Sequence, residues 1–170
     1  MMPELALDVR IEGAQAIISR MNAKIVRLSD MSDLMVAAAA EVYVATREWY
    51  DSNGESTWSP LAAATVAKKA SQGYADPERS LYAEGNLYES ATSPHGPHSF
   101  FVPISHDAVV LGVDWEKGGH QIPVVLATGT TTSGPAHNTV IPPRPIWPSE
   151  TSTAWRAMEA KIVELFLKGI

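Results

Sequence analysis

Residues 5–12 place Leu5, Leu7, Val9 and Ile11 in alternation with Ala6, Asp8, Arg10 and Glu12. This period of two is typical of a β-strand that buries one face. Gly13 follows the last apolar position and ends the pattern. We therefore expect an N-terminal strand, and its buried face consists of Leu5, Leu7, Val9 and Ile11.

Two segments after Gly13 carry apolar residues at helical spacing. In the first, which begins at Ala14, the apolar positions are Ile17, Ile18, Met21, Ile25 and Leu28. The second begins at Asp30 or Ser32, either of which can cap a helix, and continues to about Tyr50. Its apolar stripe is Met35, Ala38, Val42, Ala45 and Trp49. The stripe packs either in the core of this chain or against another subunit, and the core is the simpler interpretation.

Short helices and polar turns are predicted for the centre of the chain. Ser59 is a suitable cap, and Pro60 a suitable first residue, for a helix that ends near Ala70. A shorter helical segment is predicted over 87–91. The intervening turns at 51–57 and 93–98 are rich in Asn, Ser, Gly and Pro.

The second half of the chain is richer in β-forming residues. Segments 99–104 and 108–113 predict an antiparallel hairpin that turns at His106 and Asp107. Pro103 has no amide hydrogen to donate, so its strand is expected to lie at an edge or to contain a bulge.

Two later segments leave alternatives open. Segment 121–127 is short and apolar, which fits a strand or a single helical turn equally well. Segment 128–138 has no apolar period and predicts a mobile loop or the tip of a hairpin.

Four prolines between Val140 and Pro148 exclude a helix there and predict an extended, rigid backbone. The last element is a helix capped by Ser149 or Thr151. Its apolar face consists of Trp155, Met158, Ile162, Leu165 and Phe166. We expect this face to dock on the sheet.

Together these elements predict one α+β domain that spans residues 1–170. It has an N-terminal strand and helices, a small antiparallel sheet, and a C-terminal amphipathic helix packed on the sheet. Mobile loops are expected near 51–57, 93–98 and 128–138. Loops of this length in so small a domain are typical of segments that become ordered against a partner.

Composition narrows the class of function. The chain has 170 residues, 45% of them hydrophobic, which is enough for a core. Its formal charge of -6 argues against binding of nucleic acid through the phosphates. It has no cysteine for a disulfide or a thiolate metal site. The longest apolar run, 34–40, is too short to cross a bilayer.

Reactive side chains do not form a recognisable motif. His95 and His98 are three residues apart, but they lie in a Pro-Gly-Pro loop with no acidic residue nearby. The remaining histidines fall in predicted turns. No Gly-x-Ser-x-Gly elbow and no phosphate-binding loop is present. We therefore expect no catalytic residue, metal or cofactor, and keep a small metal-dependent enzyme built on the loop histidines as the alternative of another class.

Three segments together resemble the phage virion morphogenesis and tail-completion proteins. The first is Trp58-Ser59-Pro60-Leu61 followed by Thr65 and Lys68, the second is residues 81–90, and the third is Val140-Ile141-Pro142-Pro143-Arg144-Pro145-Ile146. They occur in the family's order and spacing from Trp58 to the end of the chain. Segment 122–129 keeps the family's glycine at Gly129, but lacks its tyrosine and histidine.

The resemblance implies a non-enzymatic subunit of the neck or upper tail of a tailed bacteriophage. Such a subunit forms a ring with copies of itself, commonly six, and joins connector and tail proteins. DNA passes through the ring without sequence-specific binding, and no membrane is involved. The implied location is the virion, after assembly in the host cytoplasm. A tail terminator, which caps the tail tube, is the alternative within this class.

The residues that we expect to build the interface or the fold come from these three segments and from the position directly after the third. They are Trp58, Pro60, Leu61, Gly85, Leu87, Ile141, Pro142, Arg144, Pro145 and Trp147. Arg144 is fixed between prolines and is predicted to bind a carboxylate, either inside the subunit or across an interface. Trp58, Trp147 and Trp49 are apolar anchors for the core or for an interface, and the core is the simpler interpretation.

Overall fold

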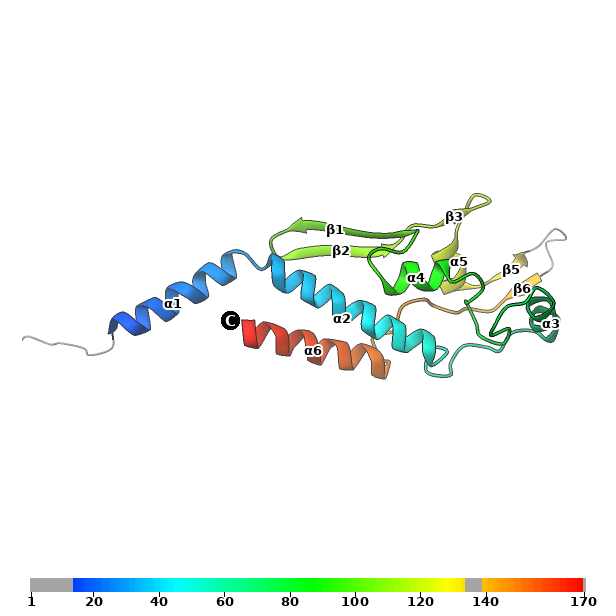
Figure 1. Cartoon of the computed structure of the whole chain (residues 1–170), viewed down its shortest axis with the longest axis horizontal. Coiled ribbons are helices and arrows are strands. Elements are labelled where there is room, and N and C mark those ends of the chain that lie inside the picture. Colours follow the sequence, from blue (N-terminus) through cyan, green and yellow to red (C-terminus); the bar gives the residue numbers. More distant parts are fainter. Residues whose placement is uncertain (1–13, 134–138, 170) are drawn as a thin grey trace, which may run out of the picture.

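A computed structural model describes residues 14–133 and 139–169 of the chain. Within these ranges the fold is α+β, with six helices and three two-stranded antiparallel sheets (Figure 1). The helices are α1 (Ala14–Ser29), α2 (Ser32–Asp51), α3 (Ala63–Ser71), α4 (Asn86–Thr92), α5 (Ile122–Thr128) and α6 (Thr153–Gly169). The strands are β1 (Ser99–Ser105), β2 (Ala108–Val113), β3 (Glu116–Lys117), β4 (His120–Gln121), β5 (Thr130–Ser133) and β6 (Thr139–Ile141). The predicted N-terminal strand lies outside the described residues.

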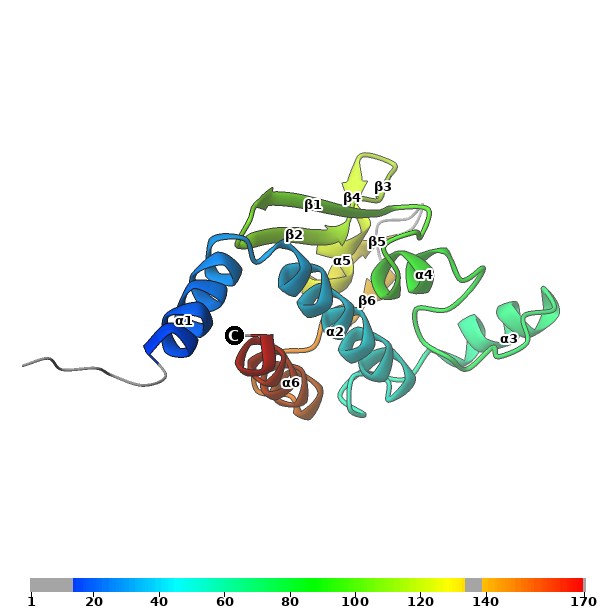
Figure 2. The ribbon, with the colours of Figure 1, turned by 60° about the vertical axis from the view of Figure 1, so that its left-hand side comes forward.

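Helices α2 and α6 run side by side along the body, as Figures 1 and 2 show. The prediction that the C-terminal helix docks on the sheet is therefore wrong, because α6 packs on α2. Both helices bury small side chains, including Ala45 of α2 and Ala154 of α6, so their backbones can approach closely. The β1–β2 hairpin and α4 instead lie against α2.

The β1–β2 hairpin confirms the sequence prediction. Phe101 pairs with Leu111, and the register shifts between Pro103 and Ser105. The shift is the bulge that Pro103 predicted, because proline cannot donate to the ladder. The predicted helices over 14–29 and 32–50 are confirmed as α1 and α2, and the helical segment over 87–91 as part of α4.

The start of α3 differs from the prediction. The helix begins at Ala63, and neither Ser59 nor Pro60 belongs to its first turn. Residues 59–61 are outside any helix. The carbonyl groups of Ser59 and Pro60 accept long-range hydrogen bonds, described below, and a helix beginning at Pro60 would change the direction of those groups.

The two ambiguous segments are each settled. Segment 122–128 forms helix α5, with a proline in its first turn. Strands β5 and β6 pair antiparallel, with Thr130 opposite Ile141, so residues 130–133 form one strand of a pair. Residues 134–138 lie outside the described residues. The mobility expected at 51–57, 93–98 and 128–138 stays a prediction.

The cap of α6 also differs from the prediction. The hydroxyl of Ser152 accepts a hydrogen bond from the backbone N–H of Trp155 at 3.1 Å, so Ser152 caps this helix. Ser149 contributes a carbonyl that accepts from Ser152 Oγ at 2.7 Å.

Among the described residues, no helix is both long enough and apolar enough to cross a membrane.

Candidate functional site

Arg144 joins two segments that are far apart in the sequence. Its guanidinium donates to the carbonyl of Ser59, from Nε at 3.1 Å and from Nη2 at 2.7 Å. Nη2 also donates to the carbonyl of Pro60 at 3.1 Å. The backbone N–H of Arg144 donates to Leu126 O at 2.6 Å. One arginine therefore fixes the proline-rich segment 140–148 against residues 59–60 and the end of α5.

The partner of Arg144 is not the carboxylate that the sequence predicted. Arg144 is buried, and among the described residues no carboxylate lies within ion-pair distance of its side chain. Burial lowers the pKa of the guanidinium, because removal from water disfavours the charged form. Two carbonyls satisfy the donors in place of an anion. The contact is inside the subunit, as one of the two predicted alternatives had it.

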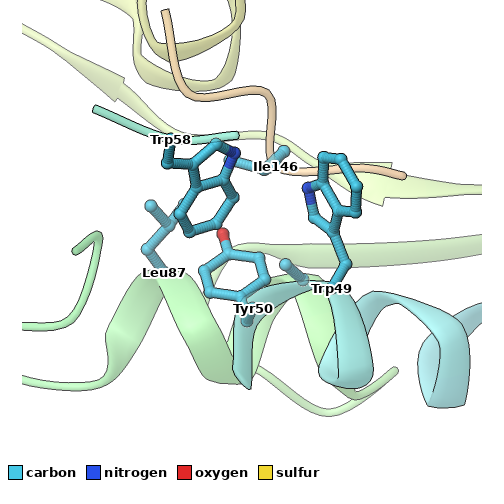
Figure 3. Close-up of a cluster of buried hydrophobic side chains, with 6 residues drawn as sticks. Trp49, Tyr50, Trp58, Leu87 and Ile146 are labelled. Atoms are coloured by element: carbon cyan, nitrogen blue, oxygen red, sulfur yellow. The ribbon is translucent and has the colours of Figure 1, made fainter. Parts of the chain in front are cut away.

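Trp58, next to the Arg144 contact, lies in the hydrophobic core (Figure 3). It is buried together with Trp49, Tyr50 and Ile146. The ring centroids of Tyr50 and Trp58 lie 5.4 Å apart at an interplanar angle of 87°, an edge-to-face contact. Trp49 Nε1 donates to the carbonyl of Pro145 at 2.8 Å. The proline-rich segment is therefore held by side chains from two other elements.

The second family-like segment reaches the same core through α4. Leu87 is buried within the cluster. Gly85 precedes the helix with φ +88°, a backbone conformation in which glycine is the least strained residue. Segments 58–68, 81–90 and 140–146 thus meet around Trp58, Leu87 and Ile146, although residues 58 and 146 lie far apart in the sequence.

The other predicted residues lie nearer the surface. Pro60 is exposed, and Leu61, Ile141, Pro142, Pro145 and Trp147 are half-buried. Trp147 packs against the outside of the core cluster. Ile141 is the last residue of β6. The predicted set therefore divides into buried residues that hold the fold, half-buried ones beside them, and the exposed Pro60.

A surface hollow of about 790 Å³ opens beside Trp58, between the turn after α2 and segment 76–80. Asp51 and Arg79 form an ion pair on its wall. The Arg79 guanidinium also stacks over Tyr82, 4.5 Å from the ring centroid. The hydroxyl of Tyr50 has no hydrogen-bond partner among the described residues, and burial raises the pKa of this group.

The histidines do not come together. His98 stacks on Trp115, with ring centroids 4.6 Å apart, and His95 is exposed. His137 lies outside the described residues. In residues 14–133 and 139–169, no three His, Asp or Glu side chains lie close enough to hold a metal ion. No observation in this part of the chain favours the metal-dependent enzyme.

Two features were not predicted from the sequence. The carboxylate of Glu55 accepts a hydrogen bond from the N–H of Ala154 at 2.8 Å, so the turn after α2 caps α6 from a distance of 99 residues. The second is the exposure of α1. Every residue from Gln15 to Ser29 is exposed, including the apolar ones. The only sequence signal for this apolar face was the helical spacing of those residues.

The structure combines a rigid core with exposed apolar side chains. The Arg144 contacts and the aromatic core fix a rigid centre, while apolar side chains stay exposed on several elements. Val44 on α2, Ile104 on β1 and Leu167 on α6 are examples. Such apolar surface is typical of proteins that pack against partners. Comparison of the chain with protein-family models, with curated proteins and with solved structures found no match.

Proposed function

We propose that this chain is a structural subunit of a tailed bacteriophage that completes the tail or joins it to the head. The observation that carries the proposal is the Arg144 contact. It joins Ser59 and Pro60 of the first family-like segment to the third, and Leu87 of the second lies in the adjoining core. The three segments resemble one family in sequence and pack at one site in the structure. This supports the proposal that the chain shares the fold of that family.

The exposed apolar side chains support an assembly role. They occur on α1, α2, β1 and α6, and several of them are more than half exposed. A subunit that packs against copies of itself and against other virion proteins would cover such surface. We propose a ring, with six subunits as the expected number, between the connector and the tail tube, assembled in the host cytoplasm and retained in the virion.

The charge of the chain fits a passage for DNA. The formal charge is -6, and like charge keeps a duplex from binding to the wall it passes. DNA then moves through the ring without sequence-specific contacts. The expected partners are further copies of the chain and the neighbouring connector and tail proteins.

Inactivation of the gene in the phage that carries it tests this function. Electron microscopy of the lysate is expected to show filled heads and finished tails that remain separate. Supplying the intact gene in trans should restore joined particles. Tubes of uncontrolled length would favour the tail terminator instead, because a missing cap leaves the tube free to grow. Normal, joined particles would overturn both readings.

A further inference from the structure

Helix α1 presents an apolar face that no other described part of its own chain covers. Met21 and Ile25 are 58% and 59% exposed, and the apolar residues around them are exposed as well. An isolated helix of this length is only marginally stable in water, and amphipathic helices gain most of their stability from packing. We therefore expect this face to pack on another surface.

The connection to α2 directs α1 away from its own body. The backbone N–H of Met31 donates to the carbonyl of His106 at 3.2 Å, which ties the junction to the β1–β2 turn. Asp30 Oδ1 accepts from the N–H of Ser32 at 3.0 Å. In Figures 1 and 2, most of α1 extends beyond the end of α2, while its last turn, at Arg27, lines a hollow together with Lys168 of α6. We therefore expect the surface that covers the apolar face of α1 to belong to another molecule.

The charge of α1 is opposite to that of the rest of the chain. Arg20, Lys24 and Arg27 are spaced four and three residues apart, which places them in one row beside the apolar face, and α1 has no acidic residue. Residues 30–170 contain nine basic and sixteen acidic residues, a net charge of -7. A second copy of this chain therefore attracts α1.

A matching groove lies along α2. It encloses about 470 Å³, and its lining combines apolar residues, including Val36, Ala40, Val44 and Phe101, with Arg47 and His95. Val36 and Val44 are about half exposed. Glu41 and Glu48 are seven residues apart and stand three and four residues from Val44, so they form an acidic row beside the groove.

We propose that α1 of one copy docks in the α2 groove of a second copy. The apolar face of α1 covers Val36, Ala40 and Val44, and Arg20 and Lys24 face Glu41 and Glu48. Because donor and acceptor surfaces differ, each copy uses both, and repetition of the contact closes into a ring or extends as a chain. The inference rests on the proposed function only for the closed ring, for which it names the contact between subunits.

Two other occupants fit less well. Pairing of α1 with a second α1 would bring two basic rows onto one helix pair. An anionic membrane would attract α1 but repel the rest of the chain, with its charge of -7. The acidic row beside an apolar groove is complementary to both features of α1.

The absence of cysteine from the chain gives a direct test, because each introduced thiol is unique. Full-length Met21→Cys protein is mixed under mild oxidation with size-tagged Ala40→Cys protein. The matched control is Ala64→Cys, an exposed alanine of α3. We expect about tenfold more mixed dimer with Ala40→Cys than with Ala64→Cys, because docking raises the local thiol concentration.

Charge reversal tests the pairing of the two rows. In the Met21→Cys chain, Arg20→Glu with Lys24→Glu should lower the yield of mixed dimer about tenfold. Glu41→Lys with Glu48→Lys in the Ala40→Cys chain should restore it. Arg156→Glu with Lys161→Glu makes the same change of charge at exposed positions of α6, and should leave the yield unchanged.

Three other outcomes would overturn the proposal. Met21→Cys dimers alone would indicate α1–α1 pairing, and an internal disulfide in a Met21→Cys/Ala40→Cys chain would indicate docking on its own body. Binding to phosphatidylserine vesicles without mixed dimers would indicate that α1 docks on a membrane.

Because these tests use pure protein, their outcome is independent of the outcome of the phage experiment. Mixed dimers together with normal particles after gene inactivation would refute the phage role and leave the contact standing, whereas separate heads and tails without mixed dimers would do the reverse.

Discussion

The guanidinium of Arg144 and the carbonyl of Ser59 form a partly buried hydrogen bond of 2.7 Å across 85 residues of sequence. The same guanidinium binds the neighbouring carbonyl of Pro60. Two chain segments that contain no regular secondary structure are thereby fixed together. Their relative position depends on this side chain together with the hydrogen bond from Trp49 to Pro145.

Replacement of Arg144 by lysine is expected to lower the free energy of unfolding by about 2 kcal/mol, because one ammonium group cannot replace all the hydrogen bonds of a charged donor fork. Urea unfolding at neutral pH measures the loss. Arg156→Lys is the matched control, since Arg156 is exposed, and should change the free energy by less than about 0.5 kcal/mol. Equal effects at the two positions would contradict the role of Arg144.

Gly54 gives a second prediction, based on close packing. Its φ is +62°, and a Cβ added there would lie 2.4 Å from Trp58 Nε1. Gly54→Ala should therefore cost about 1 kcal/mol for the left-handed backbone and about 1–3 kcal/mol more for the clash with the ring.

Gly73→Ala separates these two costs. Gly73 also has a positive φ, of +80°, but a Cβ there would meet nothing within 4 Å. It should show only the backbone cost, of about 1 kcal/mol. Urea unfolding compares the two variants, and a Gly54→Ala variant as stable as Gly73→Ala would show that Trp58 can move aside.

Local patterns predicted the elements well. The alternation over 99–113, with Pro103, predicted both the hairpin and its bulge. Apolar spacing predicted α1, α2 and most of α6. These patterns depend on neighbours a few residues apart, which the sequence displays directly.

Contacts between distant residues could not be predicted in the same way. Ser59 and Pro60 look like a helix start, but their carbonyls serve Arg144 and the helix begins at Ala63. Glu55 resembles any polar turn residue, and nothing near it in sequence reveals that it caps α6. The choice of α2 over the sheet as the partner of α6 depends likewise on three-dimensional packing.

Tyr50 predicts a dependence of stability on alkaline pH. Burial raises the pKa of its hydroxyl above the ordinary value of 10.0. Above pH 10 the unfolded chain loses this proton and the folded chain keeps it, so stability falls as pH rises, by about 1.4 kcal/mol per pH unit from this group. Tyr43, whose pKa is also raised by burial, contributes in the same direction.

The variant Tyr50→Phe should remove the part of this slope that comes from Tyr50. At pH 7 we expect a change of less than about 1 kcal/mol, because the lost hydroxyl has no hydrogen-bond partner among the described residues. Urea unfolding of both proteins between pH 7 and about pH 11 measures the difference. An identical slope in the two proteins would indicate that water reaches the hydroxyl in the folded state.

The exposure of α1 predicts an unusual contrast between two isoleucines. Ile146 is 2% exposed within the core cluster, and Ile146→Ala should cost about 2–5 kcal/mol of unfolding free energy. Ile25 is 59% exposed, so in dilute solution Ile25→Ala should cost less than about 0.5 kcal/mol. Because α1 is covered only when copies associate, the cost of Ile25→Ala should rise with protein concentration, whereas that of Ile146→Ala should stay constant. Thermal unfolding over a concentration series measures both, and a large, concentration-independent cost for Ile25→Ala would mean that α1 packs on its own chain.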